Sequence, residues 1–246
     1  MLRVKAAFIH LLLSVCVVGL VLVLMLFVWY PDGFFKLLGG GDLLYIIAGV
    51  DICLGPLLTL AVFNPAKKSL KFDLTVIALL QIAALVYGAQ VMFKSRPVFN
   101  VFEGDVFKVT LASDFKDDAE LNKASHDKWK SLSWTGPQLV AAVAPTDPKI
   151  KEEMAFAAVT GADWNVFPKL FVEYDSQRQQ ALKNAQPLSV LKKVSAENQA
   201  KVEAFELAHP GQTYVYLPIV SGYVAMAAVL DAKNADFIEI LDVETP

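Results

Sequence analysis

The sequence predicts a bundle of three transmembrane helices followed by an α+β extracytoplasmic domain with a mostly antiparallel sheet. Of its 246 residues, 55% are hydrophobic and only 19% are charged, whereas soluble domains carry about 25% charged residues. The charge is also divided, because residues 1–96 hold eight Lys/Arg against four Asp/Glu and residues 97–246 hold 14 against 21. The net charges of +4 and −7 exclude a single soluble globular domain and a nucleic-acid binder that depends on overall positive charge.

Residues 1–96 are predicted to form the membrane domain, with spans at about 6–30, 43–63 and 74–93. These three segments contain one charged residue between them, Asp51. Each is close to the roughly 20 residues that a helix needs to cross the hydrocarbon core. The first segment is longer than a signal-peptide core of about 7–15 residues, and no small-residue cleavage site follows it. We therefore expect an uncleaved anchor.

The distribution of Lys and Arg predicts how the chain crosses the membrane. With a cytoplasmic N-terminus, five basic residues near the span ends lie inside and three lie outside, as the positive-inside rule favours. The inside set is Arg3, Lys5, Lys67, Lys68 and Lys71, and the outside set is Lys36, Lys94 and Arg96. The domain formed by residues 97–246 is therefore expected outside the cytoplasm.

Asp51 is the residue that a bilayer tolerates least. A carboxylate at a helix centre costs roughly 2.5–3.5 kcal/mol on insertion scales, so its side chain should face protein. Counting the rise along each helix places Tyr87 and Gly19 at a similar depth, which predicts a hydrogen bond from Tyr87 to Asp51 beside a close glycine contact. Gly55 and Pro56 follow Asp51 by one turn, where proline removes a backbone donor and favours a kink. A structural hydrogen bond, a polar handle for a partner's transmembrane helix and a proton or ion pathway remain open as roles.

The outer domain alternates between strand-like and helix-like segments. Strands are expected at 98–102, 106–111, 138–143, 213–217, 223–230 and 237–242, and Glu103-Gly104-Asp105 predicts a hairpin between the first two. Helices are expected from Asp147-Pro148 to about Thr160-Gly161, at 176–185 and at 195–208, and residues 114–130 are expected to be helical in part. Strands at both ends with helices between them predict an α+β domain whose sheet joins the two ends. Trp129, Trp134 and Trp164 are assigned to its core rather than to an interface.

The sequence contains none of the common catalytic or metal-binding motifs that were sought in it. No G-x-S-x-G, P-loop or G-x-G-x-x-G motif occurs, and no Cys/His spacing suits zinc. Both cysteines, Cys16 and Cys53, fall inside predicted spans, where they act as small apolar residues. We therefore expect no catalytic residue, no metal and no cofactor. The net charge of −7 outside the membrane favours a partner with a basic patch.

Two segments carry a family resemblance. FVWYPDGFF (27–35) and IAGVDICLGPLLTLAVFNPAKKSLKFDLTVIALLQIAALVYG (47–88) resemble the TfpX/TfpZ family of type IV pilin accessory proteins. The arrangement of three spans and one outer domain is similar over essentially the whole chain. Residues 96–105 and 222–243 add a looser likeness.

The resemblance implies a multi-pass protein of the bacterial inner membrane with a periplasmic domain. Such a protein would bind pilin subunits and aid their stability or their assembly into pili, in a chaperone-like and non-enzymatic way. The expected partners are the major pilin and the lipid bilayer, with other pilus assembly proteins as further candidates and no nucleic acid. A membrane-anchored periplasmic sensor or solute-binding protein is the alternative.

Overall fold

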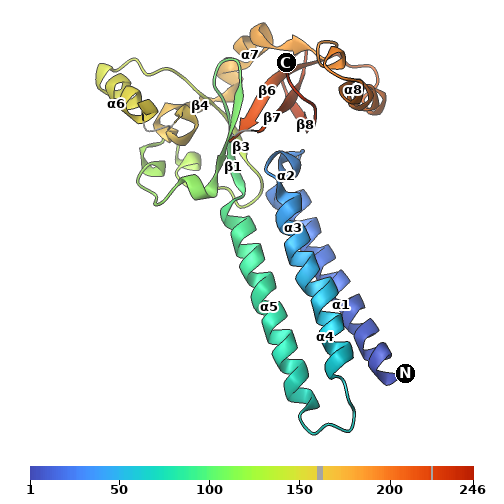
Figure 1. Cartoon of the computed structure of the whole chain (residues 1–246). Coiled ribbons are helices and arrows are strands. Elements are labelled where there is room, and N and C mark those ends of the chain that lie inside the picture. Colours follow the sequence, from blue (N-terminus) through green and yellow to red (C-terminus); the bar gives the residue numbers. More distant parts are fainter. Residues whose placement is uncertain (160–162, 223) are drawn as a thin grey trace. The chain divides into compact units, whose positions relative to one another are not determined.

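The computed structural model describes residues 1–159, 163–222 and 224–246, and the chain divides into two compact units. The first unit comprises Met1–Trp29 and Gly39–Lys94, and the second comprises Tyr30–Leu38 and Ser95–Pro246 (Figure 1). The connection between the first two spans therefore belongs to the second unit. We call Tyr30–Leu38 the first connecting loop.

The first unit consists of three helices that are long and apolar enough to cross a membrane. Leu2–Trp29 comprises α1 (Leu2–Leu24) and the π-helical η1 (Met25–Trp29). Gly40–Val62 comprises α3 (Gly40–Ala48), the π-helical η2 (Gly49–Leu54) and α4 (Gly55–Val62), and the third helix is α5 (Leu70–Lys94). The predicted spans coincide with these helices to within a few residues. Helix α4 packs against both α1 and α5.

The second unit is built around one sheet (Figure 1). Its strands are β1 (Pro97–Phe102), β2 (Phe107–Leu111), β3 (Gln138–Ala142), β4 (Phe171–Glu173), β5 (Gln186–Pro187), β6 (Tyr214–Ser221), β7 (Val224–Asp231) and β8 (Phe237–Leu241). Their order across the sheet is β4-β3-β1-β2-β6-β7-β8, with β5 paired to β6. Early and late strands therefore share one sheet, as the sequence analysis predicts.

The sheet is mixed, which corrects the prediction of a mostly antiparallel sheet. Strands β1 and β2 form the predicted antiparallel hairpin, and the β6–β7 and β7–β8 pairs are antiparallel as well. However, β3 pairs with β1 and β6 pairs with β2 in parallel. Parallel neighbours need a connection of a dozen or more residues, and the long segments that precede β3 and β6 provide it. Strand patterns alone do not reveal which neighbour such a segment leads to.

Strand β6 continues beyond its predicted end at Leu217, through Pro218 to Ser221. Proline cannot donate to a sheet ladder and normally marks the end of a central strand. On one side of β6, β5 pairs at residues 215–216 and β2 pairs at residues 219–220. Pro218 falls between these two pairings, where the absence of a donor is tolerated.

Two helices begin directly after a residue whose side chain caps the first turn. Helix α6 (Pro148–Val159) begins after Asp147, whose Oδ1 accepts a hydrogen bond from the Lys149 N–H at 2.8 Å. Helix α8 (Ala196–Ala208) begins after Ser195, whose Oγ accepts from the Asn198 N–H at 3.0 Å. The predicted end of the first helix at Thr160-Gly161, and the first residue of the strand predicted at 223–230, lie outside the described residues.

The remaining helical segments are shorter than predicted. The helix expected at 176–185 is α7 (Arg178–Asn184), and residues 114–130 form only 3-10 turns instead of longer helices. A short helix, α2 (Phe34–Leu37), lies in the first connecting loop. The 3-10 turns are η3 (Ala112–Asp114), η4 (Leu121–Lys123), η5 (Asp127–Trp129), η6 (Trp164–Val166), η7 (Pro168–Leu170), η8 (Tyr174–Gln177) and η9 (Leu191–Lys193).

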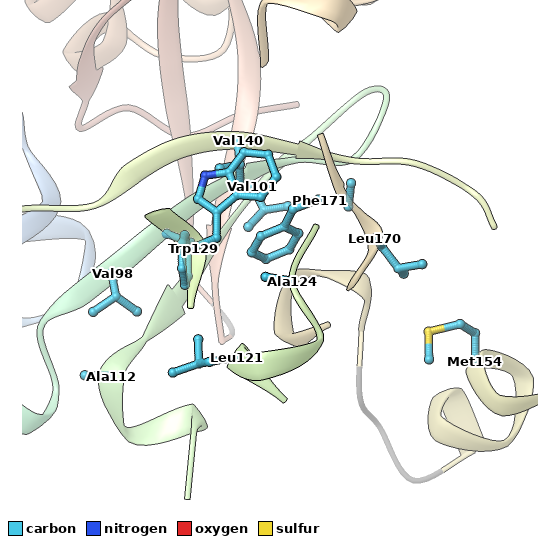
Figure 2. Packing of buried hydrophobic residues seen from close by; sticks show 12 residues of the cluster. Val98, Val101, Ala112, Leu121, Ala124, Trp129, Val140, Met154, Leu170 and Phe171 are labelled. Carbon is cyan, nitrogen blue, oxygen red and sulfur yellow. The ribbon is translucent and has the colours of Figure 1, made fainter. Parts of the chain in front are cut away.

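A cluster of buried apolar side chains fills one part of the outer unit (Figure 2). Trp129 lies at its centre, 1% exposed, with its ring centroid 6.2 Å from that of Phe171 in an edge-to-face arrangement. Trp164 packs against the same cluster and is partly buried. Trp134 is 71% exposed, so its assignment to the core is wrong, whereas the assignment of Trp129 is confirmed.

The first connecting loop is attached to strand β8 by backbone, aromatic and apolar contacts. The N–H of Ile240 donates to the carbonyl of Asp32 at 2.9 Å, and the ring of Phe34 stacks on that of Phe237 with centroids 6.2 Å apart. Three loop side chains are each only 2% exposed: Tyr30, Phe34 and Leu37. This loop is therefore a structural part of the outer unit, although about 200 residues separate it from β8 in the sequence.

An ion-pair cluster around Asp242 adds to this attachment. The Oδ2 atom of Asp242 lies 2.5 Å from Lys36 Nζ of the loop and 3.0 Å from Lys201 Nζ of α8. Burial raises the pKa of the Asp242 carboxyl, but the hydrogen bonds from Lys36 and Lys201 outweigh it and leave that pKa below its ordinary value. The stabilisation by this carboxylate is therefore present above its unfolded pKa and lost as the pH falls through the lowered folded pKa.

We expect Asp242→Asn to destabilise the outer unit by about 0.5–1 kcal/mol at pH 7, because partly exposed ion pairs contribute this much. Thermal unfolding of the full chain at pH 7 and at pH 3 measures the effect. The difference between the variant and the parent chain should shrink at pH 3, where the parent carboxyl also becomes protonated. The matched control is Asp105→Asn, which removes an exposed carboxylate from the same unit. An effect of Asp242→Asn that does not change with pH would contradict the assignment.

Candidate functional site

Asp51 is buried inside the helical bundle, as the cost of lipid exposure requires. It is 5% exposed and lies in the π-helical segment η2. In this segment the N–H of Gly55 donates to the carbonyl of Val50, five residues earlier, in place of the usual four. Single π-helical turns of this kind occur frequently at functional sites.

The wide turn and Pro56 together create an unpaired acceptor next to the carboxylate. If the π-helical pattern continued, residue 56 would donate to the carbonyl of Asp51, but proline has no N–H. The Gln81 side chain of α5 supplies the missing donor: its Nε2 lies 3.3 Å from the Asp51 backbone oxygen and 3.4 Å from Asp51 Oδ1. One carboxamide thus serves both the orphaned carbonyl and the carboxylate.

Gly55 provides the space for this contact. A Cβ at position 55 would collide with the carboxamide of Gln81. The absence of a side chain at Gly55 therefore lets α5 approach close enough for Gln81 to reach Asp51. Small residues serve the same purpose at many helix contacts in membranes.

A second polar contact joins α1 to α4 nearby. The Nδ1 atom of His10 lies 2.6 Å from the hydroxyl oxygen of Thr59, and the side chains of Ser14 and Thr59 are buried as well. The polar side chains of His10, Asp51, Thr59 and Gln81 thus contact one another in pairs between the helices of the first unit. Each polar contact joins two different helices, so the cluster also fixes the helices against one another.

A groove with a volume of about 180 Å³ lies next to this polar cluster. Its lining residues are His10, Leu13, Ser14 and Val17 of α1, Asp51 of η2, and Ala78, Gln81, Ile82 and Leu85 of α5. Helices α1 and α5 each contribute residues over two turns, a length of about 11 Å. The groove is therefore an apolar channel between two helices, with the carboxylate and an amide among its lining side chains.

The predicted site residues are only partly brought together. Asp51, Gly55 and Pro56 are buried side by side as one stretch of the second helix. Tyr87 is 70% exposed, and the side-chain donor to Asp51 is Gln81 rather than Tyr87. No atom comes within 4 Å of a Cβ built on Gly19, so the expected close glycine contact occurs at Gly55 instead.

Gln81 is a residue of this site that was not predicted from the sequence. Two features of the sequence could have indicated its role. Pro56 removes a backbone donor from the second span, and Gln81 is one of two side-chain amides in the third span. An orphaned carbonyl in a bilayer must find a donor, and uncharged amides in an apolar helix are the natural source.

The outer unit contains a polar hollow of about 380 Å³ between α8, β7 and the C-terminal residues. Its charged groups bind one another, since Lys201 Nζ lies 2.7 Å from Glu197 Oε1 and 3.0 Å from Asp242 Oδ2. Asn198 donates to the carbonyl of Glu244 at 2.8 Å. Within the described residues, no group of three or more His, Cys, Asp or Glu side chains is placed to hold a metal ion.

Comparisons with known proteins agree with the resemblance found in the sequence. A family model described as fimbrial assembly protein FimB matches residues 1–39, which cover α1, η1 and the first connecting loop. The chain is 32% identical to the serogroup I fimbrial assembly protein of Dichelobacter nodosus over 245 residues, 98% of this chain and 95% of that relative.

Two further relatives come from the same organism. The fimbrial assembly protein of serogroup E1 is 31% identical over 98% of this chain and 95% of its own length. The protein of serogroups C1 and C2 is 39% identical over 112 residues, 45% of this chain and 86% of its own length. No solved structure matches the chain.

Proposed function

Since the chain belongs to the FimB family of fimbrial assembly proteins, we propose that it is a pilin accessory protein of the bacterial inner membrane. In this proposal the groove between α1 and α5 holds the hydrophobic helix of a pilin subunit before its assembly into the pilus. The role is chaperone-like and non-catalytic. The major pilin is the principal partner.

The groove is the observation that carries the proposal. Its walls are apolar and its lining includes the carboxyl of Asp51 and the carboxamide of Gln81. A transmembrane helix of a partner would bury its side chains between α1 and α5 and turn the three helices into a four-helix arrangement. Helix association in membranes depends on such packing and on polar contacts rather than on the hydrophobic effect.

The polar side chains near the groove fit reversible binding of a partner helix better than they fit a catalytic reaction. His10 is bonded to Thr59, and Gln81 is bonded to Asp51. These contacts lie within the three-helix bundle itself, so a partner helix can leave without exposing an uncompensated charge to lipid. A subunit that must later enter a fibre needs a binding site of this kind.

The proposed topology places the N-terminus in the cytoplasm and the outer unit in the periplasm. Five Lys/Arg near the span ends then lie inside and three lie outside. The first connecting loop packs in the outer unit, which requires both to be on the same side of the membrane. This pairing supports two crossings, by the second and third spans, between the loop and residues 95–246.

A photo-reactive amino acid at position 13 tests the groove directly. Leu13 lines the groove and is 61% exposed, so we expect crosslinking in the native host to give an adduct that contains the major pilin. Leu12 is the matched control, since it is 51% exposed but lies about 100° away around α1 and does not line the groove. Capture of lipid alone at position 13, or equal pilin capture at both positions, would contradict the proposal.

A further inference from the structure

One end of the helical bundle carries several cations that no carboxylate neutralises. The basic residues at this end are Arg3, Lys5, Lys67, Lys68 and Lys71. Lys67 is neutralised, because its Nζ lies 2.5 Å from Asp73 Oδ2. The other four residues are exposed, and no carboxylate of the described residues lies within 4 Å of their charged groups. We call these four residues the basic end.

The opposite ends of the three spans offer much less available charge. Lys36 pairs with Asp242, and Arg96 is only 4% exposed. In the part of the chain that the structure describes, this leaves Lys94 as the one exposed basic residue near these span ends without a carboxylate partner. The available cations thus number four at one end and one at the other, a stronger asymmetry than the five and three counted in the sequence.

The basic end is one surface, although about 60 residues separate its two segments in the sequence. Helices α1 and α4 are held at one level by the contact of 2.6 Å between His10 Nδ1 and Thr59 Oγ1. Arg3 precedes His10 by about two turns, and α4 ends within one turn after Thr59. Figure 1 shows the N-terminus at the same end of the bundle as the loop between α4 and α5.

The helix lengths place these cations at the level of the lipid headgroups. From Lys71 to Lys94, α5 extends about 35 Å, and from Lys5 to Trp29 the first helix extends about 36 Å. The hydrocarbon core is only about 30 Å thick, and the headgroup layers bring the bilayer to about 40–45 Å. Helices of this length end among the headgroups, where the long stems of Lys and Arg let their charges reach the phosphates.

Exposed apolar side chains accompany the cations. Phe72, next to Lys71, is 70% exposed, and Leu2, next to Arg3, is 63% exposed. Apolar groups beside Lys and Arg suit the boundary between acyl chains and headgroups. An acidic protein surface in water would pair with the cations but would leave Phe72 and Leu2 without apolar surroundings. The combination therefore favours lipid as the partner.

We propose that the basic end binds the phosphodiester headgroups of anionic phospholipids. The phosphate accepts charge-assisted hydrogen bonds from the cations, and the acyl chains contact Phe72 and Leu2. Clusters of Lys and Arg directly beside a transmembrane helix attract anionic lipid in this way. The inference rests on the three helices crossing a bilayer and is independent of pilin binding.

Native mass spectrometry of the full chain, released from detergent micelles, tests the proposal. The protein is titrated with phosphatidylglycerol and, in parallel, with phosphatidylcholine of the same acyl chains, so that the lipids differ in headgroup charge. We expect the parent chain to prefer phosphatidylglycerol. One Lys or Arg at an anionic surface contributes about fivefold in affinity, so the double variant Lys68→Gln, Lys71→Gln should bind this lipid about 10- to 25-fold more weakly. Its binding of phosphatidylcholine should not change.

The matched control is the double variant Lys183→Gln, Lys193→Gln, which removes the same charge from exposed residues of the outer unit. Its affinity for phosphatidylglycerol should stay within about twofold of the parent value, because neither lysine belongs to the basic end. Equal losses in the two double variants would overturn the proposal, since only net charge would then matter.

The parent chain alone provides two further tests that do not depend on the folding of any variant. Equal affinity for the two lipids would overturn the proposal. Displacement of phosphatidylglycerol by a tenfold excess of inorganic phosphate would also overturn it, because the site would then hold free phosphate rather than lipid. Retention of the lipid in that excess is the expected result.

Discussion

Replacing Gly33 by valine is expected to destabilise the outer unit by about 3–5 kcal/mol, the sum of backbone strain and lost loop packing. Gly33 has a φ of +91°, where an L-residue with a branched side chain is strained. A Cβ at this position would also lie 2.7 Å from the carbonyl oxygen of Ile240 and 2.9 Å from its Cβ. The loop would have to lift away from β8.

Such a displacement would loosen several contacts at once. The hydrogen bond from Ile240 to Asp32 and the stacking of Phe34 on Phe237 both depend on the present distance between the loop and β8. Each fully buried large apolar side chain contributes roughly 1.5–3 kcal/mol, so exposing Phe34 accounts for much of the expected loss. Thermal unfolding or limited proteolysis of the full chain in detergent measures it.

Gly104→Val is the matched control for this substitution. Gly104 belongs to the same unit and has nearly the same φ, +90°, but nothing lies within 4 Å of its Cβ position. It should therefore lose only the backbone contribution, about 1–2 kcal/mol for an L-residue in the left-handed region. Equal effects of the two substitutions would show that the contact between the loop and β8 contributes nothing.

The second large effect is expected from Gln81→Leu in the membrane unit. Leucine fills a similar volume but donates no hydrogen bond, so both the carbonyl and the carboxyl of Asp51 would lose the donor that Gln81 provides. A buried polar group left without its partner costs about 1–3 kcal/mol, which predicts a total destabilisation of about 2–4 kcal/mol. Unfolding of the bundle by titration with a denaturing detergent is the measurement.

Gln90→Leu controls for the change in hydrophobicity. Gln90 lies on the same helix but is exposed, so its replacement is expected to change stability by less than about 0.5 kcal/mol. If pilin capture at position 13 also falls in Gln81→Leu but not in Gln90→Leu, the shape of the groove depends on this amide. Equal stability of the two variants would contradict the role of Gln81.

Local signals in the sequence predicted much of the fold. The apolar segments gave the three helices, Glu103-Gly104-Asp105 gave the β1–β2 hairpin, and Ser195 gave the start of α8. In each case neighbouring residues decide the structure. The parallel pairing of β1 with β3 could not be predicted in this way, because the long segment that precedes β3 has no pattern that selects its neighbour.

The predicted donor on the third span differs from the observed one both in depth and in direction around the helix. Tyr87 and Gln81 are six residues apart, which rotates one about 120° from the other around α5. They also differ by about 9 Å along the helix axis, so counting rise from the span ends selected the wrong level, and it does not show which face meets the second span. The π-helical turn at Gly49–Leu54 changes this facing further, and no residue type in the sequence marks such a turn unambiguously.

The attachment of the first connecting loop to β8 also sets an order of events during synthesis. The loop is made before β8, which follows it by about 200 residues. At about 5–20 residues per second, roughly 200 residues of further translation take about 10–40 s. Throughout that interval Phe34 lacks the ring of Phe237, on which it stacks in the folded chain. Closure of the outer unit therefore requires that translation has passed β8, and a chain that terminates before β8 keeps an apolar surface that quality-control proteases can recognise.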